Sequence, residues 1–162
     1  MTPYQTILVD DRAPFAAITL NRPEQRNALS FQMVDELLDA FHGLRERRDV
    51  RAVVLSGAGE HFCAGGDLAD LGSASGMSES AQDAIAGRLD ALLRAVNEAP
   101  QVVVARIAGA ALGGGFGLVC ASDIAIASTT ASFGLPEVRL GLAPAVIAPF
   151  VIQRLGLTRA RV

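Results

Sequence analysis

An α/β fold with mainly parallel strands is the architecture that this sequence predicts. Five short apolar runs have the length and composition of buried strands, and the segments between two pairs of them repeat apolar residues at helical spacing. Strands that alternate with helices favour parallel pairing, with the helices packed on the sheet. The expected strands are Thr6–Val9, Phe15–Leu20, Ala52–Leu55, Val102–Ile107 and Ile124–Ala127.

The helical segments have recognisable ends. Ser30 is placed to cap the first long helix, because its hydroxyl can accept a hydrogen bond from the first turn. The second long helix covers Ser80–Asn97 and is stopped by Pro100. Asp67 is the expected cap of a short third helix, and the stretch Gly72–Ser80 is expected to be a mobile loop.

The amino-acid composition argues against several classes of function. The chain has 162 residues, 51% of them hydrophobic, so residues 1–162 are expected to form a single domain with a sizeable core. All 14 cationic residues are arginine, and the absence of lysine excludes Schiff-base chemistry. The net charge of −3 and the absence of a basic stripe argue against nucleic-acid binding. The local cluster Arg45–Arg51 is interleaved with Glu46 and Asp49 and is interpreted as a solvated helix end.

Cysteine and histidine are sparse. Cys63 and Cys120 are isolated, which fits a reducing cytoplasm better than a disulfide framework, and we expect a cytoplasmic protein. Two histidines without metal-ligand spacing predict no metal site. No signal peptide opens the sequence, and its longest uncharged run, Ile107–Ser122, is glycine-rich and too short to cross a membrane.

The glycine triplet Gly113–Gly115, followed later by Glu137, is the strongest functional signal. Consecutive glycines let a ligand atom approach the backbone closely, and N–H groups at a helix start favour a negative oxygen. A dinucleotide fingerprint would require glycine where Cys120 stands, and a P-loop would require lysine. Packing of a helix against a neighbour remains the structural alternative for the glycines.

A second glycine turn, Glu60–Leu68, follows the apolar run ending at Leu55. It too would expose backbone donors at the end of a strand. With this segment the chain resembles the enoyl-CoA hydratase/isomerase, or crotonase, family. The matching motifs occur in family order along the whole chain: Asn21–Leu29, Phe62–Leu68, Gly109–Gly115 and Phe133–Gly141.

The resemblance implies a spiral of ββα units whose C-terminal helical part is absent, since the chain corresponds to about the first three-fifths of the family's length. It implies an acyl-CoA substrate, no separate cofactor, and a homotrimer or dimer of trimers when the C-terminal part is present. The family's oxyanion hole maps to the N–H groups of Gly66 and Gly114. CoA binding maps to Arg26, for the phosphates, and to the surrounding positions Ala28, Ala64, Gly66, Asp67, Leu68 and Gly114.

For catalysis, the resemblance assigns Glu137 as the acid/base, while Gly117 occupies the position where well-known hydratases carry a second glutamate. Two branches of the family lack that residue. One contains one-glutamate enoyl-CoA isomerases; the other contains methylglutaconyl-CoA and isohexenylglutaconyl-CoA hydratases, which the chain resembles most at Glu137–Phe150. We favour the hydratase. A CoA-binding protein without turnover, or an inactive truncated subunit, is the alternative from another class.

Overall fold

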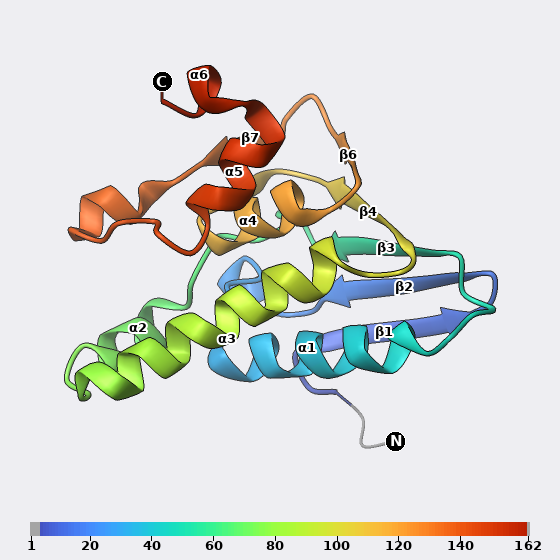
Figure 1. Ribbon diagram of the computed structural model, residues 1–162, viewed down its shortest axis with the longest axis horizontal. Helices are drawn as coiled ribbons and strands as arrows, with labels where there is room; N and C mark the ends of the chain where they lie inside the picture. The colour runs from blue at the N-terminus through green and yellow to red at the C-terminus, as the bar shows by residue number, and fades with distance from the viewer. Residues whose placement is uncertain (1–3, 162) are drawn as a thin grey trace.

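A five-stranded sheet forms the centre of the computed structural model, which describes residues 4–161 (Figure 1). Its order is β1-β2-β3-β4-β6; β1 and β2 are antiparallel, and the other neighbours are parallel. The α/β prediction is confirmed, with β1 and β3 extending further toward their C-terminal ends than predicted. The strands are β1 (Ile7–Arg12), β2 (Phe15–Leu20), β3 (Ala52–Gly57), β4 (Val102–Ile107) and β6 (Ile124–Ala127).

A second, two-stranded parallel sheet pairs β5 (Ala110–Leu112) with β7 (Ser132–Gly134). The sequence analysis missed both strands, because three residues are too few to show a period of two. Their register places Leu112 opposite Gly134. The chain leaves β5 into the glycine triplet and leaves β7 toward Glu137, so this pair sets the two motifs side by side.

Two long helices, α1 (Phe31–Arg45) and α3 (Glu79–Asn97), lie across one face of the large sheet (Figure 1). Ser30 caps α1 as predicted, its hydroxyl oxygen accepting from the N–H of Met33 at 3.1 Å. The other helices are α2 (Leu68–Ala74), α4 (Gly114–Ala121), α5 (Ala148–Leu155) and α6 (Leu157–Ala160), with the 3₁₀ turns η1 (Pro23–Gln25) and η2 (Pro136–Leu140).

The predicted loop Gly72–Ser80 is largely wrong. Its first three residues complete α2, and Ser78 caps α3 by accepting from the N–H of Ala81, so only a short turn joins the two helices. Gly72, Ser73 and Ser80 lie at exposed positions within the two helices, while Ser75, Gly76 and Ser78 lie in the turn between them. The weak helix propensity of glycine and serine made the whole stretch resemble a loop.

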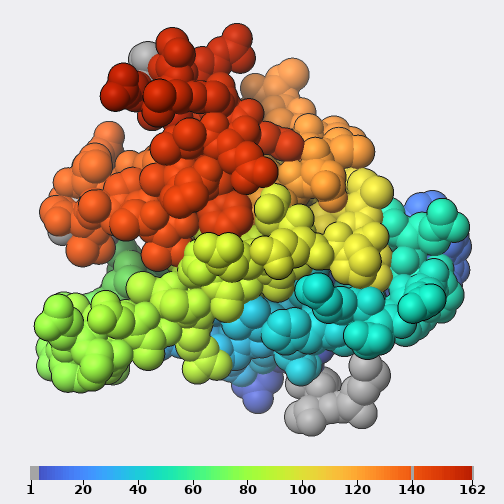
Figure 2. Space-filling view, in the orientation of Figure 1, coloured from blue at the N-terminus to red at the C-terminus, as the bar shows by residue number. Residues whose placement is uncertain are grey.

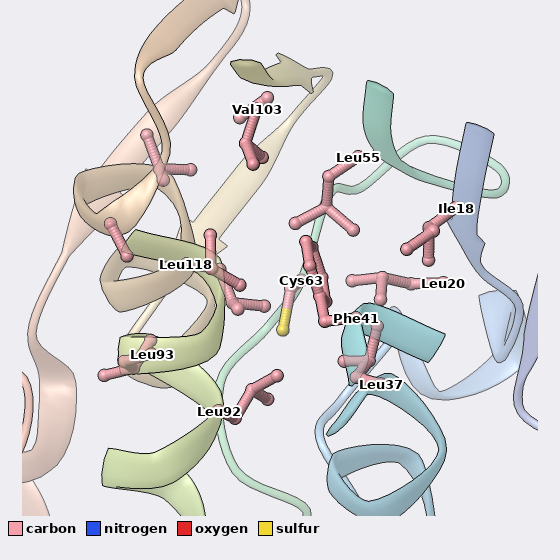
Figure 3. Close-up of a cluster of buried hydrophobic side chains, with 14 of the residues drawn as sticks. Ile18, Leu20, Leu37, Phe41, Leu55, Cys63, Leu92, Leu93, Val103 and Leu118 are labelled. Atoms are coloured by element: carbon pink, nitrogen blue, oxygen red, sulfur yellow. The ribbon is translucent and has the colours of Figure 1, made fainter. Parts of the chain in front are cut away.

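The core lies between the sheet and the helices α1, α3 and α4. Figure 3 shows Cys63 pointing into this core from the glycine turn, among leucines contributed by strands and helices. Burial raises the pKa of the Cys63 thiol to about 12, so it packs as a small apolar group rather than reacting as a thiolate. The labelled leucines around it are Leu20, Leu37, Leu55, Leu92, Leu93 and Leu118.

Candidate active site

The two predicted glycine turns lie against each other. The segment that begins at Cys63 runs between two neighbours: Cys63 pairs with Ala111 on one side, and Gly66 pairs with Leu29 on the other, both in parallel. An added Cβ on Gly65 would lie 3.7 Å from the Cα of Gly113. The turns that sequence analysis treated separately therefore form one backbone surface.

Backbone pairing sets the direction of the Gly66 N–H. Leu29 donates its N–H to the Gly65 carbonyl at 2.7 Å and accepts from the Asp67 N–H at 2.9 Å. In a parallel bridge of this kind the residue between the two bonds turns its own N–H to the opposite edge, which here is the side of the residue 110–114 segment. Within residues 4–161, the N–H groups of Gly66 and Gly114 donate to no backbone carbonyl.

The three glycines of the triplet have three different neighbours. Gly113 has φ +51°, and a Cβ there would lie 2.6 Å from Oε1 of Glu137. A Cβ on Gly114 would meet the ends of the Leu29 and Leu89 side chains, at 2.8 and 3.8 Å, whereas one on Gly115 would lie 2.6 Å from the Cβ of Cys63. The packing explanation therefore holds for Gly115. At Gly113 the Glu137 carboxylate occupies the space that a side chain would need.

Glu137 follows the first residue of η2, with Pro136 before it fixing the start of the turn. Its carboxylate lies over the Gly113 backbone, next to the start of α4. The Oε2 atom is buried and has no hydrogen-bond partner in the described part of the chain. A buried carboxylate oxygen without a donor is costly unless it serves a ligand, so Glu137 is well placed as an acid/base.

A groove of about 540 Å³ leads away from these turns. Six predicted CoA-binding residues line it together, although they come from two separate segments: Arg26, Ala28, Ala64, Gly66, Asp67 and Leu68. Gly114, at the start of α4, is not part of its lining. The sequence analysis missed Pro136 and Arg139, which join the groove from η2, and Gln25 and Ala69, which flank predicted positions.

An ion pair that sequence analysis did not find joins two walls of this groove. The Nη1 atom of Arg22 lies 2.8 Å from Oδ2 of Asp67 and donates to the Ala28 carbonyl at 2.7 Å. Asp67 is also the N-cap of α2, as predicted, accepting from the N–H of Ala69. Asn27, fully buried, donates to the carbonyls of Ala58 and His61 and holds the turn in place.

The charge on Asp67 is expected to stabilise the fold at neutral pH. Burial alone would raise the pKa of this carboxyl, but hydrogen bonds from Arg22 and from backbone N–H groups of α2 outweigh it and lower the pKa. A lowered pKa stabilises the folded state above the unfolded value of about 4, and this contribution is lost as pH falls through the folded pKa.

Asp67→Asn keeps a competent helix cap while removing the charge. We expect urea unfolding to show the largest loss of stability near pH 7 and a shrinking loss below about pH 4. If the free energy of unfolding of Asp67→Asn differed from that of the wild type by the same amount at every pH, this role of the charge would be contradicted.

Gly117 faces the apolar core. A Cβ there would lie 3.2 Å from Ile147 and 3.3 Å from the methyl groups of Leu93. Gly117→Glu is therefore expected to lower the free energy of unfolding by about 3 kcal/mol, because the added side chain starts in tight contact with buried hydrocarbon and brings a charge into a packed region. Urea unfolding measures the effect, with Gly117→Ala as the control for added volume. Unchanged stability of Gly117→Glu would show that the fold can accommodate a carboxylate at this position.

Within residues 4–161, no group of three or more histidine, cysteine, aspartate or glutamate side chains is arranged to hold a metal ion. No helix in the same range has the length and apolar character needed to cross a membrane.

The mainly parallel sheet, the two glycine turns in contact and the glutamate beside them agree with the fold and the motifs expected from the family resemblance. The profile of the enoyl-CoA hydratase/isomerase family matches residues 11–162, and the chain belongs to this family. Among solved structures it is similar to AtuE of Pseudomonas aeruginosa, with 50% identity and a TM-score of 0.94, the match covering 97% of this chain and 61% of that one.

Curated relatives agree on the family. A probable enoyl-CoA hydratase of Rhodobacter capsulatus is 39% identical over 158 residues, which cover 97% of this chain and 60% of the relative. The enoyl-CoA hydratase AKT6-1 of Alternaria alternata is 38% identical over 89% of this chain and 46% of its own length. The chain thus spans about half to three-fifths of the length of these relatives.

Proposed function

We propose that this protein is an enoyl-CoA hydratase that adds water to a 2-enoyl-CoA thioester. The observation that carries the proposal is the position of the Glu137 carboxylate, against Gly113 and beside the contact of the two glycine turns. The reaction needs backbone donors that polarise the substrate carbonyl and one group that transfers a proton. The glycine turns are proposed to supply the donors, and Glu137 the proton-transfer group. The reaction requires no cofactor beyond the CoA of the substrate.

In the proposed reaction the thioester oxygen accepts hydrogen bonds from the N–H groups of Gly66 and Gly114. Glu137 takes a proton from water as the water oxygen bonds to Cβ, and the electrons of the double bond move onto the thioester oxygen. The protonated Glu137 then returns a proton to Cα, which regenerates the carboxylate. Each backbone donor is expected to contribute about 3–4 kcal/mol of transition-state stabilisation.

The acyl group is proposed to be branched or carboxylated, on the sequence resemblance over Glu137–Phe150. Gly117, buried against Leu93 and Ile147, leaves Glu137 as the single carboxylate of the two catalytic positions. A single carboxylate also suits an enoyl-CoA isomerase, which moves one proton between Cα and Cγ, and this is the second candidate.

The test is hydration of crotonyl-CoA and of methylglutaconyl-CoA by the purified protein, followed as loss of the enoyl-thioester absorbance. Faster hydration of the carboxylated substrate supports the proposal. Conversion of a 3-enoyl-CoA without net hydration would favour the isomerase. CoA binding measured by calorimetry, without turnover of any of these substrates, would favour a non-catalytic CoA-binding protein.

A further inference from the structure

The groove is lined by two arginines from different segments. Arg26 follows η1, and Arg139 is the fourth residue of η2, two positions after Glu137. Both side chains are exposed, and neither guanidinium lies within ion-pair distance of a carboxylate in the part of the chain that the structure describes. The groove therefore presents two uncompensated positive charges.

The acidic residue in the same groove does not cancel these charges. Asp67 is paired with Arg22 at 2.8 Å, and both side chains are largely buried. Because this pair is neutral as a unit, an anion entering the groove meets Arg26 and Arg139 without repulsion from an unpaired carboxylate there.

The backbone at Arg26 is strained. It has φ +51°, and the following Asn27 has φ +55°, a conformation that non-glycine side chains seldom adopt. Buried hydrogen bonds of Asn27 to Ala58 and His61 hold the turn, and the Arg26 carbonyl accepts from the N–H of Ala64. Strain maintained in this way at a groove is typical of a residue that binds a ligand.

Figure 2 shows that the α2–α3 segment and the segment that leads into η2 project from the same side of the molecule. The η2 turn at the end of the second segment carries two charged side chains. The Glu137 carboxylate lies against Gly113, and Arg139 lines the groove. A ligand whose reacting carbons lie at Glu137 would extend from Gly66 along the groove toward the arginines.

We propose that Arg139 is a second phosphate-binding residue that acts with Arg26, and that the pair makes the protein select thioesters of the phosphorylated CoA nucleotide over thioesters of bare pantetheine. Planar guanidinium groups bind phosphate oxygens through paired donors, which suits this task. The inference rests on the proposed function, because it takes CoA as the ligand.

The experiment is calorimetric titration of the protein with CoA, dephospho-CoA and pantetheine at two salt concentrations. The variants are Arg26→Gln, Arg139→Gln and Arg139→Lys, and Arg48→Gln is the matched control, an exposed arginine outside the groove. We expect Arg139→Gln to weaken CoA binding about tenfold, with a smaller salt dependence, and to leave pantetheine binding unchanged. Arg139→Lys should recover part of the affinity, and Arg48→Gln should bind as wild type.

The dephospho-CoA titration separates the phosphate groups. If Arg139→Gln weakens CoA but not dephospho-CoA, the residue binds the 3′-phosphate; if it weakens both, it binds the diphosphate. Either result supports the inference. Unchanged CoA affinity in Arg139→Gln, or an equal loss for CoA and pantetheine, overturns it. A loss of affinity confined to thioesters with carboxylated acyl groups also overturns it, because Arg139 then binds the acyl group.

Failure of the proposed function has a different signature. It is seen when the wild-type protein neither binds CoA nor hydrates an enoyl-CoA. Wild-type hydration of enoyl-CoA together with equal affinity for CoA and pantetheine overturns only the phosphate-binding role.

Discussion

Replacing Glu137 by glutamine is expected to lower the turnover of the best enoyl-CoA substrate by about 10²–10⁴-fold, the usual contribution of general acid–base catalysis. The amide keeps the size of the side chain but cannot accept and return the proton. Its contacts lie at the Gly113 backbone, and the CoA groove is lined mainly by other segments. CoA affinity is therefore expected to stay nearly unchanged, so the loss should appear in kcat.

The measurement is steady-state hydration kinetics beside calorimetric CoA binding. Glu98→Gln, at the exposed end of α3, makes the same chemical change outside the site and should retain the wild-type rate. Wild-type turnover by Glu137→Gln would show that another segment supplies the base, and would remove the central assignment of the proposed mechanism.

The strands and the two long helices could be predicted because each has a local signal. Apolar runs mark β2, β4 and β6 with their observed limits, and a serine precedes both α1 and α3. These signals depend on residues a few positions apart and are therefore visible in the sequence. The length-three strands β5 and β7 have no such signal, and only their tertiary pairing defines them.

Site residues within the family motifs could be predicted from the sequence, but their contacts with other segments could not. The resemblance to a family located Gly66, Gly114 and Glu137 and the groove residues of the first two motifs, but composition and periodicity alone would not have grouped them. Pairs such as Arg22 with Asp67 depend on which loops meet in space. The polar type and spacing of these two residues carry no signal of their contact, so the ion pair could be found only from the structure.

The separate roles of the three glycines Gly113–Gly115 could not be predicted from the sequence. Sequence analysis treated the three glycines as one feature that was either a backbone donor site or a helix-packing surface. In the structure Gly113 faces a carboxylate and Gly115 packs on Cys63, so the packing explanation holds at Gly115, while the donor role of Gly114 stays a prediction. A pattern of identical residues cannot distinguish their surroundings, which come from segments distant along the chain.

Gly113→Ala is expected to lower turnover about 10²-fold through displacement of Glu137. The added methyl group would lie 2.6 Å from Oε1 of that carboxylate, so the side chain has to move. The backbone at Gly113 has φ +51° and ψ −124°, which only glycine adopts readily, and a loss of about 1–3 kcal/mol in the free energy of unfolding is expected as well. Kinetics and urea unfolding measure the two effects separately.

Gly114→Ala is the matched control. Its methyl group would meet only the side-chain ends of Leu29 and Leu89, and the Gly114 N–H is retained, so a smaller loss of turnover is expected. A double-mutant cycle with Glu137→Gln then separates displacement of the carboxylate from general damage to the site. If Gly113→Ala acts by moving Glu137, it should cost little further turnover once the carboxylate has been removed. Two losses that multiply fully would show that Gly113 influences the reaction independently of Glu137, and would contradict its assignment as the residue that leaves room for this carboxylate.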